Sequence, residues 1–239
     1  MPMPKLLQLF LDNQNRPRDF HVKAEGNEAE IYLYDAIGAW FGVAAEDFVR
    51  ELRNLDGVET IHLRMNSPGG DVFEGRAMAT ALSQVKARTV CHIEGLSASA
   101  ATYVAAACDE VEIADGGFYM IHEAWTLTLG NKRDHEHQIG LLSKVDDSII
   151  GDYAKRTGVD RQQLIDWMAA ETWFNAAEAV EHGFADRMLE TDRSQNRKRA
   201  QWNLAAYQNV PAALTDQPPP EQLFDRVQAE RRLALLERR

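Results

Sequence analysis

One stretch of the sequence indicates the fold most clearly: residues 89–101, which read TVCHIEGLSASAA. Its first half, Thr89 to Ile93, is a short apolar and β-branched run of the kind that forms a buried strand. Glycine, serine and alanine follow, and the alanine-rich segment after Ser99 favours a helix. A strand that passes through a glycine-containing turn into a helix is typical of α/β proteins, and here it leaves Ser99 at the junction.

The same alternation of short strands and helical patterns extends in both directions from this stretch. Strands are predicted at four further places: residues 31–34, 60–65, 111–113 and 118–121. The longest helical pattern runs from about His137 to Arg156, and its partly apolar stripe suits either packing on the domain or an oligomer contact. We therefore expect an α/β fold.

Three segments are expected along the chain: an N-terminal segment (1–29), a globular domain (30–190) and a flexible, basic and Pro-rich C-terminal tail (191–239). The tail contains a basic cluster, Arg193 with Arg197–Arg199, and a triple proline at 218–220. Its last residues, from Glu221, form a weak Leu/Val stripe that would suit a terminal helix.

Composition restricts the partners. The 239 residues have a formal net charge of −11, which argues against nucleic acid or an anionic membrane as the main partner. No apolar run approaches the length of a membrane span. The two cysteines, Cys91 and Cys108, lie in apolar stretches and are expected to be buried free thiols in a reducing compartment. A cytoplasmic protein is therefore expected.

Two glycine-containing turns follow predicted strands, NSPGG at 66–70 and GLSAS at 95–99. A serine at such a junction exposes its hydroxyl, and glycines at the other junction let backbone N–H groups approach a substrate carbonyl. His122, at the end of a predicted strand, could take the proton of Ser99, and a carboxylate would orient the imidazole. Each piece alone is weak, so the argument rests on their order and spacing.

These residues resemble the ordered landmarks of Clp protease proteolytic subunits. The matching motifs are Asn66-Ser67-Pro68-Gly69-Gly70, Gly95-x-x-Ala98-Ser99-Ala100-Ala101, Met120-Ile121-His122 and Trp173-Phe174-x-Ala176-x-Glu178-Ala179-Val180-Glu181-x-Gly183. The resemblance spans roughly Ile31 to Leu189. It implies a ClpP/crotonase-like fold of repeated β-β-α units with a protruding long helix. Tyr32-Leu33-Tyr34-Asp35 and Glu171-Thr172-Trp173-Phe174 resemble the phage and prophage branch, which includes peptidases that mature viral capsids.

The resemblance implies a serine endopeptidase with Ser99 as nucleophile and His122 as general base. The backbone N–H groups of Gly70 and Ala100 would form the oxyanion hole, with Gly69 shaping the turn.

The acid of the triad is assigned to Glu171. Family members usually have aspartate at this position, so one extra methylene must be accommodated. Asp166 is the alternative acid, and a charge on a helix surface is the simpler interpretation of both residues.

The resemblance further implies a homo-oligomeric ring, a heptamer or tetradecamer, that cleaves polypeptide substrates. A Clp-type ATPase or phage capsid proteins are the expected partners. The chain has no Gly-x-x-x-x-Gly-Lys-[Ser/Thr] loop, so any ATP would be used by a partner. No cofactor or metal is expected, because His135 and His137 at i, i+2 do not share a helix face. Deleting residues 191–239 is expected to leave the cleavage of short peptides intact.

Three rival interpretations stay open. In a signal-peptide-peptidase-like hydrolase, Lys144 or Lys155 would replace histidine as the base. An enoyl-CoA hydratase-like enzyme would use the oxyanion hole without a serine nucleophile. A non-catalytic structural homologue would keep the fold alone. Ser97, two positions before Ser99, is interpreted as a small packing residue.

Overall fold

The computed structural model describes residues 5–14, 17–189, 202, 204 and 207–215. Its contacts divide the chain into two compact units, Met1–Asn209 and Val210–Arg239. In the second unit the described residues form one short helix, α8 (Ala212–Thr215). The sheet, the other helices and the candidate site all belong to the first unit.

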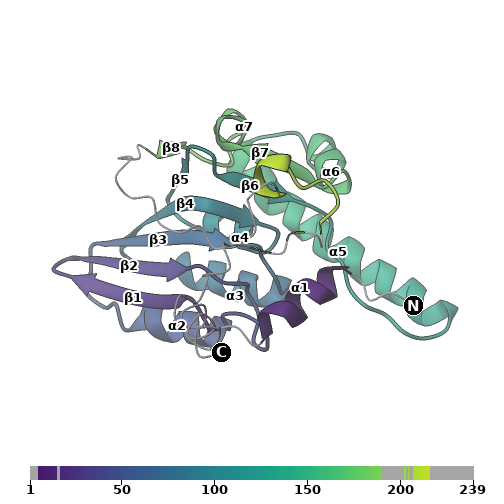
Figure 1. The fold of residues 1–239 in the computed structure, drawn as a ribbon, viewed down its shortest axis with the longest axis horizontal. Helices are drawn as coiled ribbons and strands as arrows, with labels where there is room; N and C mark the ends of the chain where they lie inside the picture. Colours follow the sequence, from purple (N-terminus) through teal and green to yellow (C-terminus); the bar gives the residue numbers. More distant parts are fainter. Residues whose placement is uncertain (1–4, 15–16, 190–201, 203, 205–206, 216–239) are drawn as a thin grey trace, which may run out of the picture. The chain divides into compact units, whose positions relative to one another are not determined.

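A mixed, eight-stranded sheet forms the centre of the first unit (Figure 1). Its strands are β1 (Phe20–Glu25), β2 (Glu28–Leu33), β3 (Thr60–Ser67), β4 (Arg88–Ala98), β5 (Glu110–Ala114), β6 (Phe118–Ile121), β7 (Thr172–Asn175) and β8 (Arg187–Leu189). Strands β2, β3, β4, β5 and β8 are parallel neighbours, in that order. The antiparallel pairs are β1 with β2, at one end of this order, and β7 with β6, on a branch in which β6 pairs with β4.

The longest strand, β4, changes partner along its length. It pairs first with β5, through Val90–Ile93, and then with β6, through Leu96–Ala98. Because the second partner continues the ladder, Gly95 and the residues after it belong to the strand, although the sequence pattern placed them in a turn. Since β4 and β6 are parallel, their carboxyl ends meet at one edge, which brings Ser99 and His122 together.

The helices are α1 (Lys5–Gln14), α2 (Ala45–Arg53), α3 (Val72–Leu82), α4 (Ala101–Ala106), α5 (Lys132–Thr157), α6 (Arg161–Ala169) and α7 (Ala176–Glu181). In Figure 1, α2, α3 and α4 lie together on one face of the sheet, and α5 extends away from it. The long helix begins earlier than predicted because Asn131 caps it, in a capping box with Asp134. The segments β1-β2-α2 and β5-β6-α5 follow the predicted β-β-α order.

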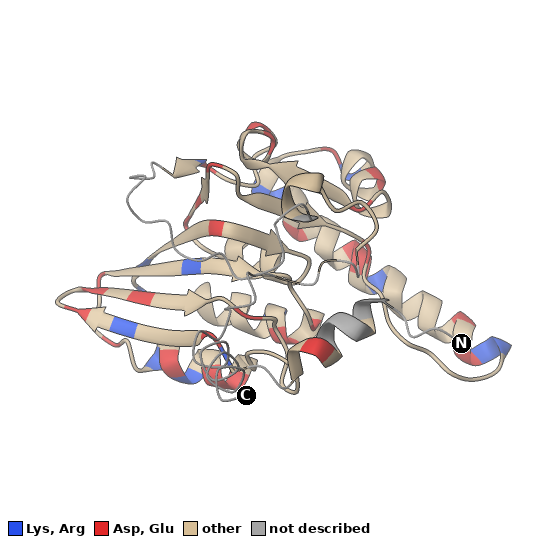
Figure 2. Cartoon of the chain, viewed as in Figure 1, with Lys and Arg blue, Asp and Glu red and all other residues tan. Residues whose placement is uncertain are grey.

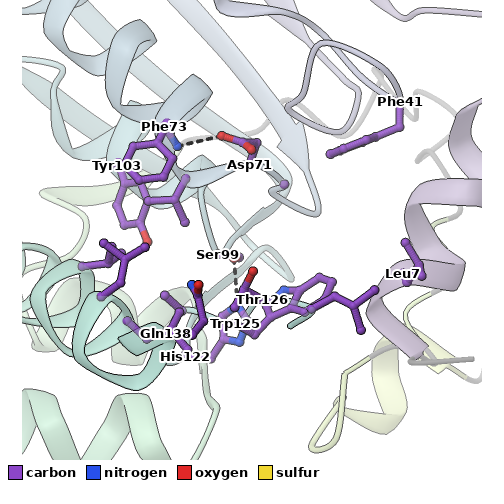
Figure 3. Close-up of a pocket in the computed structure, with 17 residues that line it drawn as sticks. Leu7, Phe41, Asp71, Phe73, Ser99, Tyr103, His122, Trp125, Thr126 and Gln138 are labelled. Carbon is purple, nitrogen blue, oxygen red and sulfur yellow. Dashed lines mark hydrogen bonds between the residues drawn. The ribbon is translucent and has the colours of Figure 1, made fainter. Parts of the chain in front are cut away.

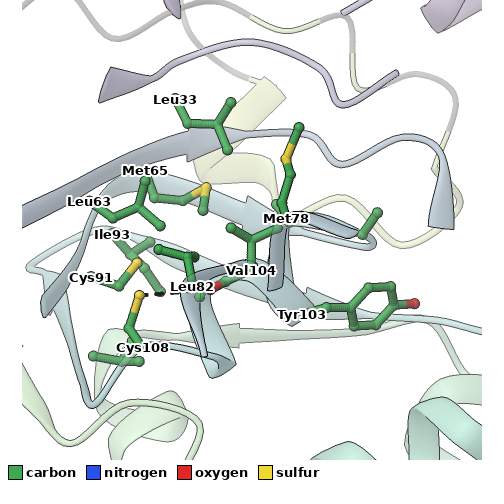
Figure 4. Close-up of a cluster of buried hydrophobic side chains, with 14 of the residues drawn as sticks. Leu33, Leu63, Met65, Met78, Leu82, Cys91, Ile93, Tyr103, Val104 and Cys108 are labelled. Atoms are coloured by element: carbon green, nitrogen blue, oxygen red, sulfur yellow. Dashed lines mark hydrogen bonds between the residues drawn. The ribbon is translucent and has the colours of Figure 1, made fainter. Parts of the chain in front are cut away.

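The core lies between the sheet and helices α3 and α4 (Figure 4). Alternate strand residues such as Leu63 and Ile93 meet Met78 and Leu82 of α3, in agreement with the predicted periods of strand and helix. The two cysteines, Cys91 and Cys108, are buried and unpaired, as predicted.

Some elements were not predicted from the sequence. Strand β1 lies in the segment assigned to the N-terminal 1–29, and β7 lies just before the last predicted helix. The first compact unit continues to Asn209, past the domain boundary predicted at residue 190. The basic cluster, the triple proline and the terminal helix predicted from Glu221 all lie outside the described residues.

Candidate active site

Ser99 follows the last residue of β4 in a conformation that is rare for a residue with a side chain, at φ 52°. Its N–H donates to the Met120 carbonyl at 2.9 Å, and its carbonyl accepts from Thr102 N at 2.9 Å. These bonds, to β6 and to the first turn of α4, hold the strained backbone in place. The hydroxyl is thereby fixed at the edge of the sheet.

His122 follows the end of β6 and faces this hydroxyl. Its Nε2 lies 2.7 Å from Ser99 Oγ (Figure 3). Enclosure of the ring lowers the pKa of His122 to about 4, and the negative charge of Glu171 opposes this shift. The imidazole is therefore neutral at pH 7, the form that can accept a proton.

The glycine turn lies against Ser99. Gly69 has φ +86°, and a Cβ on it would lie 2.7 Å from Ser99 Cβ. Gly70 has φ +155°, and a Cβ there would overlap the carbonyl of Ile37. Two backbone bonds fix the turn to this neighbour, Ile37 N to Gly69 O and Asp71 N to Ile37 O, both at 2.9 Å. Only glycine fits both positions.

Backbone donors of the predicted oxyanion hole flank the same serine. In the described part of the chain, no hydrogen bond is donated by the backbone N–H of Gly70 or of Ala100. Ala100 directly precedes α4, where the first N–H groups of a helix have no partner within the helix. Both N–H groups are thus able to bind a substrate oxygen.

Glu171 is buried and has φ 50°, just before β7. Its Oε1 accepts from Trp173 Nε1 at 3.2 Å, from Gln208 N at 2.7 Å and from Asn209 N at 2.8 Å. Among the described residues, no hydrogen bond joins this carboxylate to His122, on which it acts through its charge. The alternative acid, Asp166, lies exposed on α6 and accepts a bond from Gln162 Nε2.

A cavity of about 280 Å³ contains Ser99 and His122 (Figure 3). Much of its wall is apolar and comes from α3, from α5 and from the loop between β6 and α5: Val72, Trp125, Leu127, Leu141, Leu142 and Val145. Residues 124–127 of that loop all line the cavity. An apolar cavity beside a nucleophile suits the binding of an apolar side chain.

Other predicted candidates lie apart from this pair. Lys144 is exposed on α5, and Lys155 lines a different cavity. Ser97 is fully buried, as expected for a packing residue. His135 and His137 are exposed on α5, and the described residues contain no group of three metal-ligating side chains. Within the same residues, no helix is long and apolar enough to cross a membrane.

A serine and a neutral histidine at the carboxyl ends of parallel strands, beside a glycine turn and a cavity, define a serine hydrolase on an α/β scaffold. The sequence profile of the Clp protease family matches residues 22–192. The chain therefore belongs to the Clp protease family, and it is a serine-type peptidase.

Individual relatives agree with this family assignment. An ATP-dependent Clp protease proteolytic subunit from Borreliella afzelii is 27% identical over 140 residues, which is 58% of this chain and 71% of the relative. The proteolytic subunit from Deinococcus radiodurans is 26% identical over 154 residues, 62% of this chain and 76% of the relative. A ClpP1 mutant structure from Listeria monocytogenes shares the fold with a TM-score of 0.61 at 21% identity, over 68% of this chain and 91% of that one.

Residues 207–209 contact the site from beyond the family match and were not predicted from the sequence. Tyr207 packs edge-on against the His122 ring, with centroids 5.7 Å apart, and Gln208 and Asn209 bond to Glu171. No period or motif marks this stretch, so its aromatic residue, Tyr207, was the available signal.

Proposed function

We propose that this protein is an endopeptidase that cleaves polypeptides through Ser99, His122 and Glu171. The observation that carries the proposal is the 2.7 Å contact between Ser99 Oγ and His122 Nε2 inside an apolar cavity. Ser99 Oγ attacks the scissile carbonyl carbon while its proton moves to His122 Nε2. His122 then protonates the leaving amine, and a water molecule, activated by the same imidazole, hydrolyses the acyl ester and restores Ser99.

The oxyanion of each tetrahedral intermediate is assigned to the backbone N–H groups of Gly70 and Ala100. Both flank the nucleophile, and fixed donors of this kind stabilise charge where it develops. Glu171 stabilises the imidazolium that forms on His122 by its charge, since it makes no hydrogen bond to the ring among the described residues. Asp166 is exposed on α6, where it accepts a bond from Gln162, and is therefore less suited to this role.

A ring-shaped homo-oligomer is the proposed assembly, a heptamer or a tetradecamer of two rings. Large apolar side chains in the loop before α5 and in its first turns are exposed: Leu127 (60%), Leu129 (88%) and Ile139 (63%). A second copy of the chain that covers them would remove this apolar surface from water. Light scattering should show the oligomer, and a monomer at micromolar concentration would contradict it.

The rivals named above are less well supported. The hydroxyl of Ser99 faces His122, whereas Lys144 and Lys155 lie outside the cavity. A hydratase-like enzyme would have no use for the serine–histidine contact, and neither would an inactive homologue. The buried, unpaired cysteines agree with a cytoplasmic location.

Two biological roles suit such a peptidase: ATP-dependent proteolysis with a Clp-type ATPase as partner, or maturation of a phage head. The relatives are named as proteolytic subunits of an ATP-dependent Clp protease, which is in line with the first role. A neighbouring unfoldase gene would favour the first, and a capsid or portal gene the second.

Ser99→Ala tests the proposal, with Ser97→Ala as the matched control two residues away. Loss of the nucleophile should lower turnover of a fluorogenic peptide by a factor on the order of 10⁶, whereas Ser97→Ala should keep activity. Circular dichroism checks that both variants fold. A folded Ser99→Ala protein that retains about a tenth of the activity would exclude Ser99 as nucleophile.

A further inference from the structure

Residues 207–209, called here the strap, contact three parts of the active site. Tyr207 is 4% exposed, and its hydroxyl donates to the carbonyl of Pro68 in the glycine turn at 2.5 Å. Its ring meets His122 edge-on, at an interplanar angle of 88°, and Trp173 at a centroid distance of 5.6 Å. The strap thus bridges the turn, the proposed base and the segment that contains the acid.

The strap backbone holds the carboxylate of Glu171. Two of the three N–H groups that donate to Oε1 come from Gln208 and Asn209, at 2.7 and 2.8 Å. Hydrogen bonds to a charged carboxylate are stronger than bonds between neutral groups. The side chain of Asn209 also donates to Ala170 O at 2.7 Å, next to the strained backbone of Glu171.

We propose that the strap is a positioning element of the active site: its backbone N–H groups fix the Glu171 carboxylate, and the Tyr207 ring closes one side of His122. This inference rests on the proposed peptidase function. A segment that only filled space would contact apolar neighbours. The polar groups of the strap instead donate hydrogen bonds to Pro68 of the glycine turn and to the Glu171 carboxylate. The strap lies beyond residues 22–192, so it is an addition to the part of the chain that matches the family.

The groups around His122 determine how its pKa should respond to loss of the strap. The ring faces Ser99, Glu171 and Tyr207, and the nearby Asp146 of α5 is occupied by a bond from Ala124 N at 2.7 Å. Burial is the main cause of the low pKa of this imidazole. Removing the Tyr207 ring admits water to the imidazole, so its pKa should rise toward the ordinary value.

The test compares Tyr207→Ala and Tyr207→Phe in the full-length protein. Tyr32→Ala is the matched control, because Tyr32 is about as buried as Tyr207 and lies on β2, where it stacks on His21 at 4.3 Å. NMR follows the titration of the His122 imidazole, whose signal is assigned because it is missing from the spectrum of His122→Gln. Cleavage of a fluorogenic peptide gives kcat/KM as a function of pH. In Tyr207→Ala, the His122 midpoint and the acid limb of kcat/KM should both move up by about one pH unit or more.

Tyr207→Phe keeps the ring and should restore the wild-type titration and acid limb, and Tyr32→Ala should leave both unchanged. Should Tyr207→Ala fail to fold, Tyr207→Leu replaces it with the same expected direction. An unshifted His122 titration in a folded Tyr207→Ala or Tyr207→Leu protein would overturn the inference. Because the titration needs no turnover, it decides the role of the strap even if the wild-type protein proves inactive, a result that would count against the proposed function.

Discussion

Two histidines of this protein, His92 and His122, are each enclosed and each lie beside a carboxylate, yet they belong to different surroundings. His92 lies within β4 on the face of the sheet opposite the core, where its Nδ1 is 2.7 Å from Glu112 Oε2 and its Nε2 is 2.9 Å from His62 Nδ1. His122 lies at the end of β6, where its Nε2 meets Ser99 Oγ and no hydrogen bond to Glu171 is described. Burial lowers the pKa of both rings to about 4.

The charged groups around His92 form a network across neighbouring strands. Arg64 of β3 bridges Glu30 of β2 and Glu94 of β4, with contacts of 2.6 and 2.8 Å. Figure 2 shows the same alternation, with acidic positions on β2 and β4 and a basic position on β3 between them. Ion pairs of this kind link side chains on one face of adjacent strands and stabilise the sheet.

The difference shows that a carboxylate–histidine contact does not by itself make a catalytic site. His92 lies within hydrogen-bond distance of a carboxylate, that of Glu112, but its other ring nitrogen is occupied by His62. His92 does not line the cavity that contains Ser99. His122 has a serine, a glycine turn and a cavity instead. The two histidines differ in position: His92 lies within a strand, whereas His122 follows the carboxyl end of one, where loops carry functional residues.

The largest expected effect separates the two histidines directly. His122→Ala should lower kcat by a factor on the order of 10⁶, because the base is lost, whereas His92→Ala should leave kcat nearly unchanged and lower stability instead. A peptide assay and a thermal melt on both variants measure this. Equal losses of activity would mean that the contrast between the two histidines is wrong.

The next effect separates the two carboxylates. Glu171→Gln should lower kcat by roughly 10² to 10⁴, because a neutral amide no longer stabilises the imidazolium. Glu112→Gln should leave kcat intact, although it removes the charged partner of His92 and Arg187. Glu171→Asp is expected to retain activity, since it restores the residue usual in the family.

Asp166→Asn serves as the control for the acid. If this variant is inactive while Glu171→Gln matches the wild type, the acid is Asp166, and the assignment of Glu171 fails.

The smallest expected effect is on the pH dependence of the free energy of unfolding, to which both histidines contribute. Well above pH 6.5 neither the folded nor the unfolded form protonates them, so they contribute no pH dependence there. Between pH 6.5 and about 4 the unfolded chain takes up protons that the folded protein excludes, so the free energy of unfolding should fall as the pH falls. Urea titrations should show a shallower fall for His92→Gln, by about one proton in the slope. An identical slope would show that His92 is protonated in the fold.

Much of this site was predictable from sequence because its parts are local. Ser99 follows the glycine and serine residues after the β-branched run 89–93, and His122 follows the apolar run 118–121. The ladder between the parallel strands β4 and β6 then brings the two residues to one edge. The strap was not predictable, because Tyr207 meets Pro68 across 139 positions of the chain and its stretch has no period. The expectation that residues 191–239 can be deleted without effect on peptide cleavage is therefore revised by the proposal for the strap.

Strand β7 was not predicted, for a related reason. Its four residues, Thr172–Asn175, are stabilised by antiparallel pairing with β6 and run directly into α7, so the local pattern resembles the approach to a helix. The bonding of Glu171 was equally inaccessible, since a motif assigns a residue to a role without stating where its oxygens point.

Covalent labelling with a fluorophosphonate tests the central claim most directly, because the probe reacts with a serine hydroxyl that a neighbouring base has activated. Mass spectrometry of the digested wild-type and Ser97→Ala proteins should find the adduct on Ser99. Ser99→Ala should show no adduct, and His122→Ala should label far more slowly. A folded wild-type protein that stays unlabelled, or that is labelled at another serine, would contradict the assignment of Ser99 and His122 as the catalytic pair.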